Sequence, residues 1–219
     1  MLPILLLGET RRCDAFVAKT GWEVVRKDNP VGLRFDDYSL VVDLDFDQFP
    51  ERMAFYAKSK TALFLVQAVR IRLSAVLAGV NALIMEQRIA GLNAWAGCLE
   101  ADRWELMTIG PDNAVLAMLK NKLSFPLEIC GDRVGMITPR VMAMIINEAY
   151  YTVQEGTATK DDIDLGMKLG TNYPGGPFEW CEKWGIAELY HLLEALWLDT
   201  REERYKICPL LKTEYLRSL

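Results

Sequence analysis

The stretch from residue 131 to residue 185 contains the strongest helix signals of this sequence and constrains its fold most. Apolar residues cover most of the circumference of a predicted helix over residues 133–154, which is typical of a helix buried on nearly all sides. Pro139 would break an intrahelical hydrogen bond, so we expect a kink or a helix start near Thr138. Polar residues interrupt the apolar run, which is therefore too short to span a bilayer.

Further helices are predicted after this one, over residues 160–169, from Pro177 to Gly185 and over residues 186–197. Thr159 is the expected N-cap of the first of them, because its hydroxyl can accept a hydrogen bond from a free backbone N–H group. Asp162, at the third helical position, places a negative charge near the positive helix end. Gly170 is expected to end this helix in the left-handed conformation. The C-terminal part of the chain is therefore predicted to be all-α.

In the N-terminal half, short apolar runs alternate with helical patterns. We expect strands over residues 2–7, 22–26, 39–46, 62–67, 89–96, 104–109 and 127–130, and helices over residues 14–20, 49–59, 71–79 and 111–123. A continuous apolar run such as the first, which ends at Gly8, is typical of a buried parallel strand. The alternation predicts an α/β fold with a doubly wound parallel sheet. The expected domain boundary divides the chain into residues 1–131 and 132–219.

Composition narrows the classes of partner and compartment. A net charge of −5 argues against a nucleic-acid partner and against binding to an acidic membrane surface. The apolar N-terminus lacks a basic region and a small-residue cleavage site, so we interpret it as a strand and not as a signal peptide. The five cysteines are scattered and show no C-x-x-C spacing. They predict free, buried thiols in a reducing compartment, the cytoplasm, and no metal site.

The helical stretch resembles the C-terminal domain of the 3-hydroxyacyl-CoA dehydrogenase family. The matching residues, which also have matching spacing, are Asn147–Ala149, Glu155–Gly156, Asp161–Asp164, Met167–Gly170 and, above all, Tyr173–Glu179. The order of strands and helices before it resembles a shortened form of that family's Rossmann-like domain. The resemblance implies NAD-dependent oxidation of a 3-hydroxyacyl-CoA in fatty-acid metabolism. It also implies an all-helical C-terminal domain through which two subunits pair as a homodimer.

The resemblance implies NAD-binding positions at Gly8, Thr10, Asp28 and Asp43, the last two being acids at strand ends. The family's loop is G-x-G-x-x-G, whose glycines allow a tight turn and close approach of the pyrophosphate to the backbone. Here only the first glycine is present. Thr10 places a branched side chain at the second position, and Glu9 adds a negative charge where phosphate should bind. NAD is thus the implied cofactor, but the altered loop argues against its binding.

The catalytic pair of the family is altered as well. The resemblance implies a histidine base, oriented by a glutamate, that removes the hydroxyl proton as hydride leaves. Asn93 stands in the position of the histidine, and an amide cannot act as a general base near neutral pH. Glu105 aligns with the glutamate but is expected to have nothing to orient. The chain also has room only for a loop between Asp28 and Tyr38, where the family has a helical arm that helps to hold coenzyme A.

These observations leave three hypotheses open. The leading one is a degenerate homologue with little or no hydride transfer, which keeps some affinity for an acyl-CoA. The second is a structural or regulatory subunit that pairs with itself, or with an active relative, through the helix over residues 134–153. The third is an active dehydrogenase with a rebuilt site. The only histidine, His191, lies far outside the motif and is interpreted as a surface or interface side chain.

Overall fold

The computed structural model describes residues 2–80 and 82–219, and the contacts within it divide the chain into two compact units. The first is Met1–Met136 and the second is Ile137–Leu219. The boundary predicted from the sequence follows residue 131. Over the residues that the structure describes, no helix is both long enough and apolar enough to cross a membrane.

The first unit is built on a seven-stranded sheet, counted over the described residues, with the order β2-β1-β3-β4-β5-β6-β7. The strands are β1 (Ile4–Leu7), β2 (Val24–Lys27), β3 (Leu40–Asp43), β4 (Leu63–Gln67), β5 (Ile89–Leu92), β6 (Trp104–Met107) and β7 (Leu127–Cys130). β1 to β5 are parallel, β6 pairs antiparallel with β5, and β7 is parallel to β6. The predicted α/β class with a Rossmann-like sheet is confirmed. β6 and β7 depart from the predicted parallel arrangement, because they run opposite to the other five strands.

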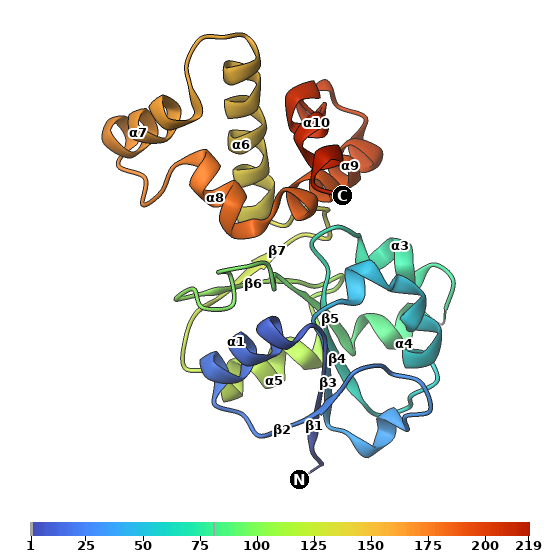
Figure 1. Ribbon diagram of the computed structural model, residues 1–219. Coiled ribbons are helices and arrows are strands. Elements are labelled where there is room, and N and C mark those ends of the chain that lie inside the picture. The colour runs from blue at the N-terminus through green and yellow to red at the C-terminus, as the bar shows by residue number, and fades with distance from the viewer. Residues whose placement is uncertain (1, 81) are drawn as a thin grey trace. The chain divides into compact units, whose positions relative to one another are not determined.

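The helices of the first unit connect successive strands (Figure 1). They are α1 (Thr10–Thr20), α2 (Met53–Tyr56), α3 (Leu73–Leu77), α4 (Ala82–Glu86) and α5 (Ala114–Lys122). α1 and α5 lie on one side of the strands, and α3 and α4 lie on the other. α1 begins four residues before the predicted start at Asp14, because Glu9 caps it. The segment predicted as a loop between Asp28 and Tyr38 contains a short 3₁₀ turn over Phe35–Asp37.

The core of the first unit is made by its central strands. Every residue of β1, β3, β5 and β6 is buried, as expected for strands covered on both faces. Leu5, Leu6 and Leu7 are completely inaccessible to solvent. Fully burying one leucine side chain contributes about 2 kcal/mol to stability. β1 is therefore a fixed element, and the turn that follows it is held in a defined place.

The second unit is helical, as predicted. Its helices are α6 (Thr138–Gln154), α7 (Lys160–Thr171), α8 (Pro177–Trp184), α9 (Ile186–Thr200) and α10 (Pro209–Arg217). α6 begins at Thr138 with Pro139 in its first turn, so the predicted start is confirmed. α7 does not end at Gly170 but runs on to Thr171, and Asn172 adopts the left-handed conformation instead. α10 was absent from the sequence prediction.

The capping of α8 explains the most specific part of the resemblance. Both oxygens of the Asp164 carboxylate accept hydrogen bonds at the start of α8, at 2.8 Å from the Phe178 N–H and at 3.1 Å from the Glu179 N–H. The carboxylate thus satisfies free donors and stabilises the positive helix end. A Cβ atom at Gly176 would overlap the Asp164 carboxyl group. The glycine is therefore required so that α7 and α8 can approach each other.

Asn147 has a comparable structural role on α6. Its side-chain NH₂ donates to the Lys206 carbonyl oxygen at 2.9 Å, and its side-chain oxygen accepts from the Cys208 N–H at 2.9 Å. These bonds hold the turn that leads into α10. Glu214 of α10 then accepts a hydrogen bond from the Tyr150 hydroxyl at 2.8 Å. The position of α10 thus depends on contacts between residues that are more than fifty positions apart in the sequence.

We expect Gly176→Ala to destabilise the second unit by about 2–4 kcal/mol, because the new methyl group would displace the Asp164 cap. Urea unfolding followed by circular dichroism measures the change. Gly170→Ala is the matched control, since a Cβ atom there meets no atom within 4 Å. In the helix interior this control should leave stability unchanged or raise it by about 1 kcal/mol. Equal effects of both variants would contradict the role assigned to Gly176.

Candidate functional site

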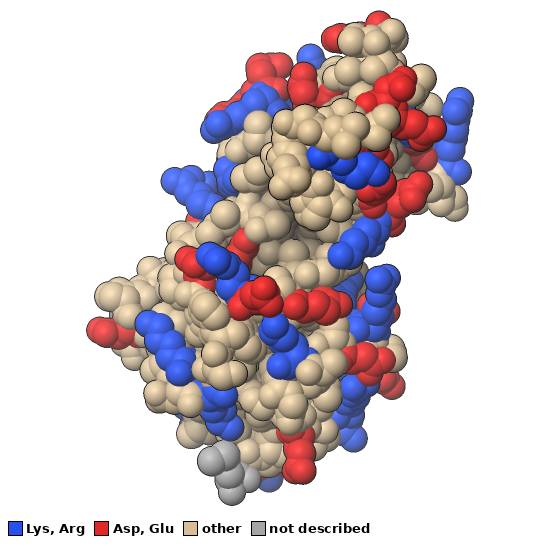
Figure 2. Space-filling view, turned by 90° about the vertical axis from the view of Figure 1, so that its left-hand side faces the viewer, with Lys and Arg blue, Asp and Glu red and all other residues tan. Residues whose placement is uncertain are grey.

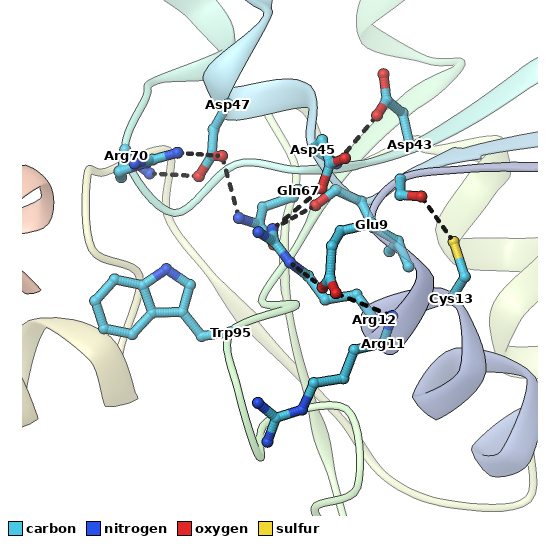
Figure 3. A network of polar contacts seen from close by, with 12 residues as sticks. Glu9, Arg11, Arg12, Cys13, Asp43, Asp45, Asp47, Gln67, Arg70 and Trp95 are labelled. Atoms are coloured by element: carbon cyan, nitrogen blue, oxygen red, sulfur yellow. Dashed lines mark hydrogen bonds and ion pairs between the residues drawn. The ribbon is translucent and has the colours of Figure 1, made fainter. Parts of the chain in front are cut away.

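The candidate site lies at the carboxyl ends of the parallel strands β1, β3 and β4, where open α/β sheets bind their ligands. Gly8 and Glu9 follow β1, Asp43 ends β3, and Gln67 ends β4. Figure 3 shows the polar contacts that these residues make with one another and with neighbouring arginines. The chemistry of this edge therefore depends on which of these groups remain free for a ligand.

Glu9 occupies the N-terminus of α1. Its carboxylate accepts a hydrogen bond from the Arg11 N–H at 3.2 Å, and its other oxygen lies 3.8 Å from the Arg12 Nε atom (Figure 3). In a dinucleotide-binding turn, the free N–H groups of this helix end would bind a pyrophosphate. Here a carboxylate of the chain itself already binds there. A phosphate would have to displace Glu9 and overcome its negative charge.

The three positions of the altered glycine motif have different roles. Gly8 has φ 137°, a conformation that other residues rarely adopt, and a Cβ atom there would come within 2.9 Å of the Leu44 Cβ atom, so both the backbone and the packing require glycine. Thr10 is exposed at the first position of α1. Cys13 is buried, and its thiol donates to the Gly8 carbonyl oxygen at 3.4 Å. Burial raises the pKa of this thiol to about 11, so the thiol is uncharged at neutral pH. Of the three positions, only Gly8 is a glycine, and it is the one with a positive φ.

Asp43 ends β3, as predicted, but its carboxylate is used within the chain. It is completely buried, and both of its oxygens lie 3.0 Å from the Arg52 Nη1 atom. The Tyr56 hydroxyl donates to it at 2.6 Å. These partners leave Asp43 unsuited to bind a ribose. Asp28, by contrast, is exposed just after β2 and remains open to solvent.

Two further acids, Asp45 and Asp47, belong to the same edge and were not identified from the sequence. The Arg12 Nη1 atom lies 3.4 Å from the Asp45 Oδ1 atom and donates to the Leu44 carbonyl oxygen at 2.8 Å. Burial raises the pKa of Asp45, and the charge of Arg12 opposes that rise. The alternate spacing of the aspartates at positions 43, 45 and 47 is the sequence pattern that could have identified them.

Asp47 is buried and receives three hydrogen bonds. The Gln67 side-chain NH₂ donates to it at 3.1 Å, the Arg70 N–H at 3.2 Å and the Arg70 guanidinium at 3.3 Å. Burial raises the pKa of Asp47, and Arg70 acts in the opposite direction. A buried carboxylate needs such partners, because an unpaired charge would cost several kcal/mol. The network thus joins β3 to the segment after β4.

Asn93 and Glu105, the two residues that the resemblance aligns with the family's catalytic pair, contact each other directly. Asn93, the residue after β5, is buried, and its side-chain NH₂ donates to the Glu105 Oε2 atom at 3.2 Å. Its side-chain oxygen accepts from the Trp95 N–H at 3.3 Å. The expectation that Glu105 has nothing to orient is therefore wrong, because Glu105 orients this amide. The pair thus consists of an amide that donates and a carboxylate that accepts, and the amide cannot accept a proton near neutral pH.

The one histidine of the sequence belongs to the second unit. His191 lies on α9 of the second unit, where its Nε2 atom is 3.4 Å from the Tyr215 hydroxyl. Within the described part of the chain, no group of three His, Cys, Asp or Glu side chains is arranged to hold a metal ion. On the face in Figure 2, Lys and Arg side chains are interspersed with Asp and Glu, so no extended basic stripe is seen there.

Asp43→Asn should lower the free energy of unfolding by about 3 kcal/mol, because it leaves the charge of Arg52 without its buried counter-ion. Urea unfolding at pH 7 measures this loss. Asp28→Asn is the control, since Asp28 is exposed, and it should change stability by less than about 0.5 kcal/mol. If Asp43→Asn were as stable as the control, Asp43 would be free to take a ligand.

Comparison with solved structures defines the class of this fold. The M. tuberculosis FadB2 structure superposes with a TM-score of 0.83 and 17% identity, over 100% of this chain and 94% of that one. The (S)-3-hydroxybutyryl-CoA dehydrogenase PaaH1 of Ralstonia eutropha gives a TM-score of 0.78 and 17% identity, over 100% of this chain and 94% of that one. At this identity the likeness concerns the fold. The chain thus has the Rossmann-type sheet followed by a helical domain that is found in dehydrogenases of this class.

The sequence comparisons identify the family. Residues 135–216 match the family model of the 3-hydroxyacyl-CoA dehydrogenase C-terminal domain. The 3-hydroxyadipyl-CoA dehydrogenase of Escherichia coli K12 is 40% identical over 111 residues, which are 49% of this chain and 23% of that protein. The 3-hydroxybutyryl-CoA dehydrogenase of Bradyrhizobium diazoefficiens is 32% identical over 106 residues, 47% of this chain and 36% of that protein. The resemblance predicted from the sequence is confirmed for the helical domain: residues 135–216 are similar to the C-terminal domain of the 3-hydroxyacyl-CoA dehydrogenases.

These matches cover only part of the relatives. The chain spans 23% of the E. coli protein and 36% of the Bradyrhizobium protein, well under two thirds of either length. The matched family model covers the helical domain, whereas the altered residues at positions 8–13 and 93 lie before it. The similarity to the family therefore rests on the helical domain, and any activity depends on the residues of the first unit.

Proposed function

We propose that this chain is a homologue of the 3-hydroxyacyl-CoA dehydrogenases that has lost NAD-dependent hydride transfer. The observation that carries the proposal is the buried pair in which Asn93 donates to Glu105. Oxidation of a 3-hydroxyl group requires a base for the hydroxyl proton when hydride leaves the carbon. The Asn93 amide stays neutral and has no basic lone pair near neutral pH. Glu105 is already bound to that amide and has no imidazole to orient.

The cofactor position supports the same proposal. NAD does not fit the turn after β1 as it stands, because the Glu9 carboxylate binds the N–H group of Arg11 at the start of α1. Thr10 adds a branched side chain where a glycine would let the pyrophosphate approach the backbone. Asp43 is committed to Arg52 and Tyr56. Pyrophosphate and ribose binding are thus weakened independently of the missing base.

Titration of the purified chain with NADH tests this proposal, with tryptophan fluorescence and calorimetry as the two readouts. We expect no saturable binding in the range of typical cofactor affinities, and no oxidation of NADH after acetoacetyl-CoA is added. Separate titration with acetoacetyl-CoA determines whether affinity for an acyl-CoA is kept without turnover. Tight NADH binding followed by turnover would refute the loss of activity and favour a rebuilt active site.

The double variant Glu9→Gly/Thr10→Gly serves as the internal comparison for this experiment. It removes the competing carboxylate and the branched side chain, so binding of ADP, which carries the pyrophosphate, should become measurable. Turnover should remain absent, since Asn93 is unchanged. If the variant bound ADP no better than the parent chain, the obstruction would not be due to Glu9 and Thr10.

A second candidate function, pairing of two chains through the helical unit, is favoured by an exposed apolar stripe. Ile137, Val141 and Ile145 follow one another at four-residue spacing along α6, and Val141 is 53% exposed. The expectation that α6 is buried on nearly all sides is therefore wrong for the single chain. On α7, Leu165 and Leu169 have the same spacing and are 54% and 78% exposed. A second copy that covers these residues would bury large apolar area.

We expect the chain to be a dimer by sedimentation equilibrium, and Val141→Glu and Leu169→Glu each to shift it toward monomer. A buried carboxylate would cost several kcal/mol at such an interface. Leu198→Glu, at a leucine of α9 that is 56% exposed, is the matched control and should remain dimeric. A monomeric parent chain, or dissociation of the control to the same extent, would contradict pairing through α6 and α7.

The compartment proposed for this function is the cytoplasm. All five cysteines are free, and Cys13, Cys181 and Cys208 are buried. Cys98 and Cys130 are only partly buried, which corrects the expectation that all five thiols are buried. Free thiols are typical of a reducing compartment, where enzymes of acyl-CoA metabolism can work.

A further inference from the structure

A pocket of about 450 Å³ lies in the first unit, away from the strand ends described above. It is formed by the segment that follows β2 and by the end of α2. Its lining residues are Pro30, Gly32, Leu33, Arg34, Phe35, Asp36, Phe55, Lys58 and Ser59. Its volume is within the range of about 300–1,000 Å³ that is typical of small-molecule sites.

The walls of this pocket are fixed by Asp36. Its Oδ1 atom accepts from the Ser59 hydroxyl at 2.6 Å, the Lys60 N–H at 2.9 Å and the Thr61 N–H at 3.1 Å. These bonds hold the pKa of Asp36 well below its usual range, the Ser59 bond having the largest effect. The segment after β2 is thereby tied to the turn before β4. The Asp36 carboxylate thus fixes both walls of the pocket, the segment after β2 and the turn before β4.

The charge of the pocket is positive. The negative charge of Asp36 is balanced by the positive charge of Arg88. The Arg88 guanidinium donates to the Ser59 carbonyl oxygen at 3.0 Å. Arg34 and Lys58 are exposed at the pocket, and within residues 2–80 and 82–219 neither forms a salt bridge. Two positive charges thus face the pocket without a carboxylate partner. An anionic group that entered would gain two ionic contacts.

The apolar part of the pocket lies beside these cations. Phe55 is 38% exposed, and the Lys58 Nζ atom lies 5.6 Å from the centre of its ring. Leu33 also lines the pocket and is only partly buried. Exposed apolar groups beside unpaired cations favour a ligand that has an apolar body and a negatively charged end.

We propose that this pocket binds a small amphiphilic anion, with its apolar body against Phe55 and its anionic group between Arg34 and Lys58. The site is separate from the strand-end crevice, because the two share no residue. Binding here requires neither NAD nor the Asn93–Glu105 pair. A ligand can therefore bind here whether or not the chain has lost dehydrogenase activity, and the two proposals can fail separately.

Titration with 8-anilinonaphthalene-1-sulfonate, an aromatic anion whose fluorescence rises in apolar surroundings, tests the proposal. We expect saturable binding of one molecule per chain that weakens as ionic strength rises. N-phenyl-1-naphthylamine, which lacks the sulfonate, should bind at least about tenfold more weakly, since a tenfold change corresponds to about one charged contact. Equal binding of the neutral probe would overturn the proposal, because the cations would then contribute nothing.

The variants Arg34→Ala/Lys58→Ala and Phe55→Ala locate the binding. Each should weaken the sulfonate probe by about tenfold or more, while the thermal unfolding temperature stays close to that of the parent chain, because all three side chains are exposed. Lys212→Ala/Arg217→Ala removes the same charge from the exposed surface of α10 and is the matched control. Unchanged binding in Arg34→Ala/Lys58→Ala, or an equal loss in the control, would refute this site.

Competition experiments distinguish two classes of amphiphilic anion, fatty carboxylates and aryl phosphates. Octanoate and phenyl phosphate are added to the complex with the sulfonate probe. Displacement by either one supports the proposal, and the stronger competitor identifies the anionic group that the pocket prefers. Failure of both to displace the probe would overturn it, because the probe would then be held by its rings alone.

Discussion

Carboxylates at the ends of buried strands need cationic partners, and this need organises the ligand edge of the sheet. Asp43 is bound by Arg52, and Asp47 is bound by Arg70. Removal of either partner would leave a buried charge and cost about 3–5 kcal/mol. The segments that carry the arginines are thereby fixed against the sheet. Side chains that are paired in this way stabilise the edge and cannot bind a ligand at the same time.

The parts of the fold that local sequence determines could be predicted. β1 and β3 are continuous apolar runs, and the N-cap at Thr159 is a local signal. The reversed direction of β6 and the presence of α10 could not be predicted, because they depend on pairing and packing between distant residues. In the site, the change of base to Asn93 was visible in the sequence. Its hydrogen bond to Glu105 and the cap by Glu9 became visible only in three dimensions.

The residues that most resemble the family in this chain stabilise the helical unit. Asp164 and Gly176 join α7 to α8, and Asn147 holds the turn before α10. Substitutions at these positions would harm folding whether or not the chain catalyses a reaction. Residues of a catalytic site are needed only while the reaction is needed. A strong match in the helical domain therefore identifies ancestry and fold, whereas the function depends on sites carried by that fold.

The burial of Cys13 has a consequence for the history of this chain. Its side chain belongs to the hydrophobic core, together with Phe16 of the same helix. Return to glycine at position 13 would leave a void and cost about 1–2 kcal/mol before any cofactor could bind. If the chain has lost hydride transfer, as proposed above, positions 9, 10 and 93 would also have to change, and no single one of these changes would restore turnover. Under that proposal, selection for activity would favour no intermediate, and the loss would be difficult to reverse.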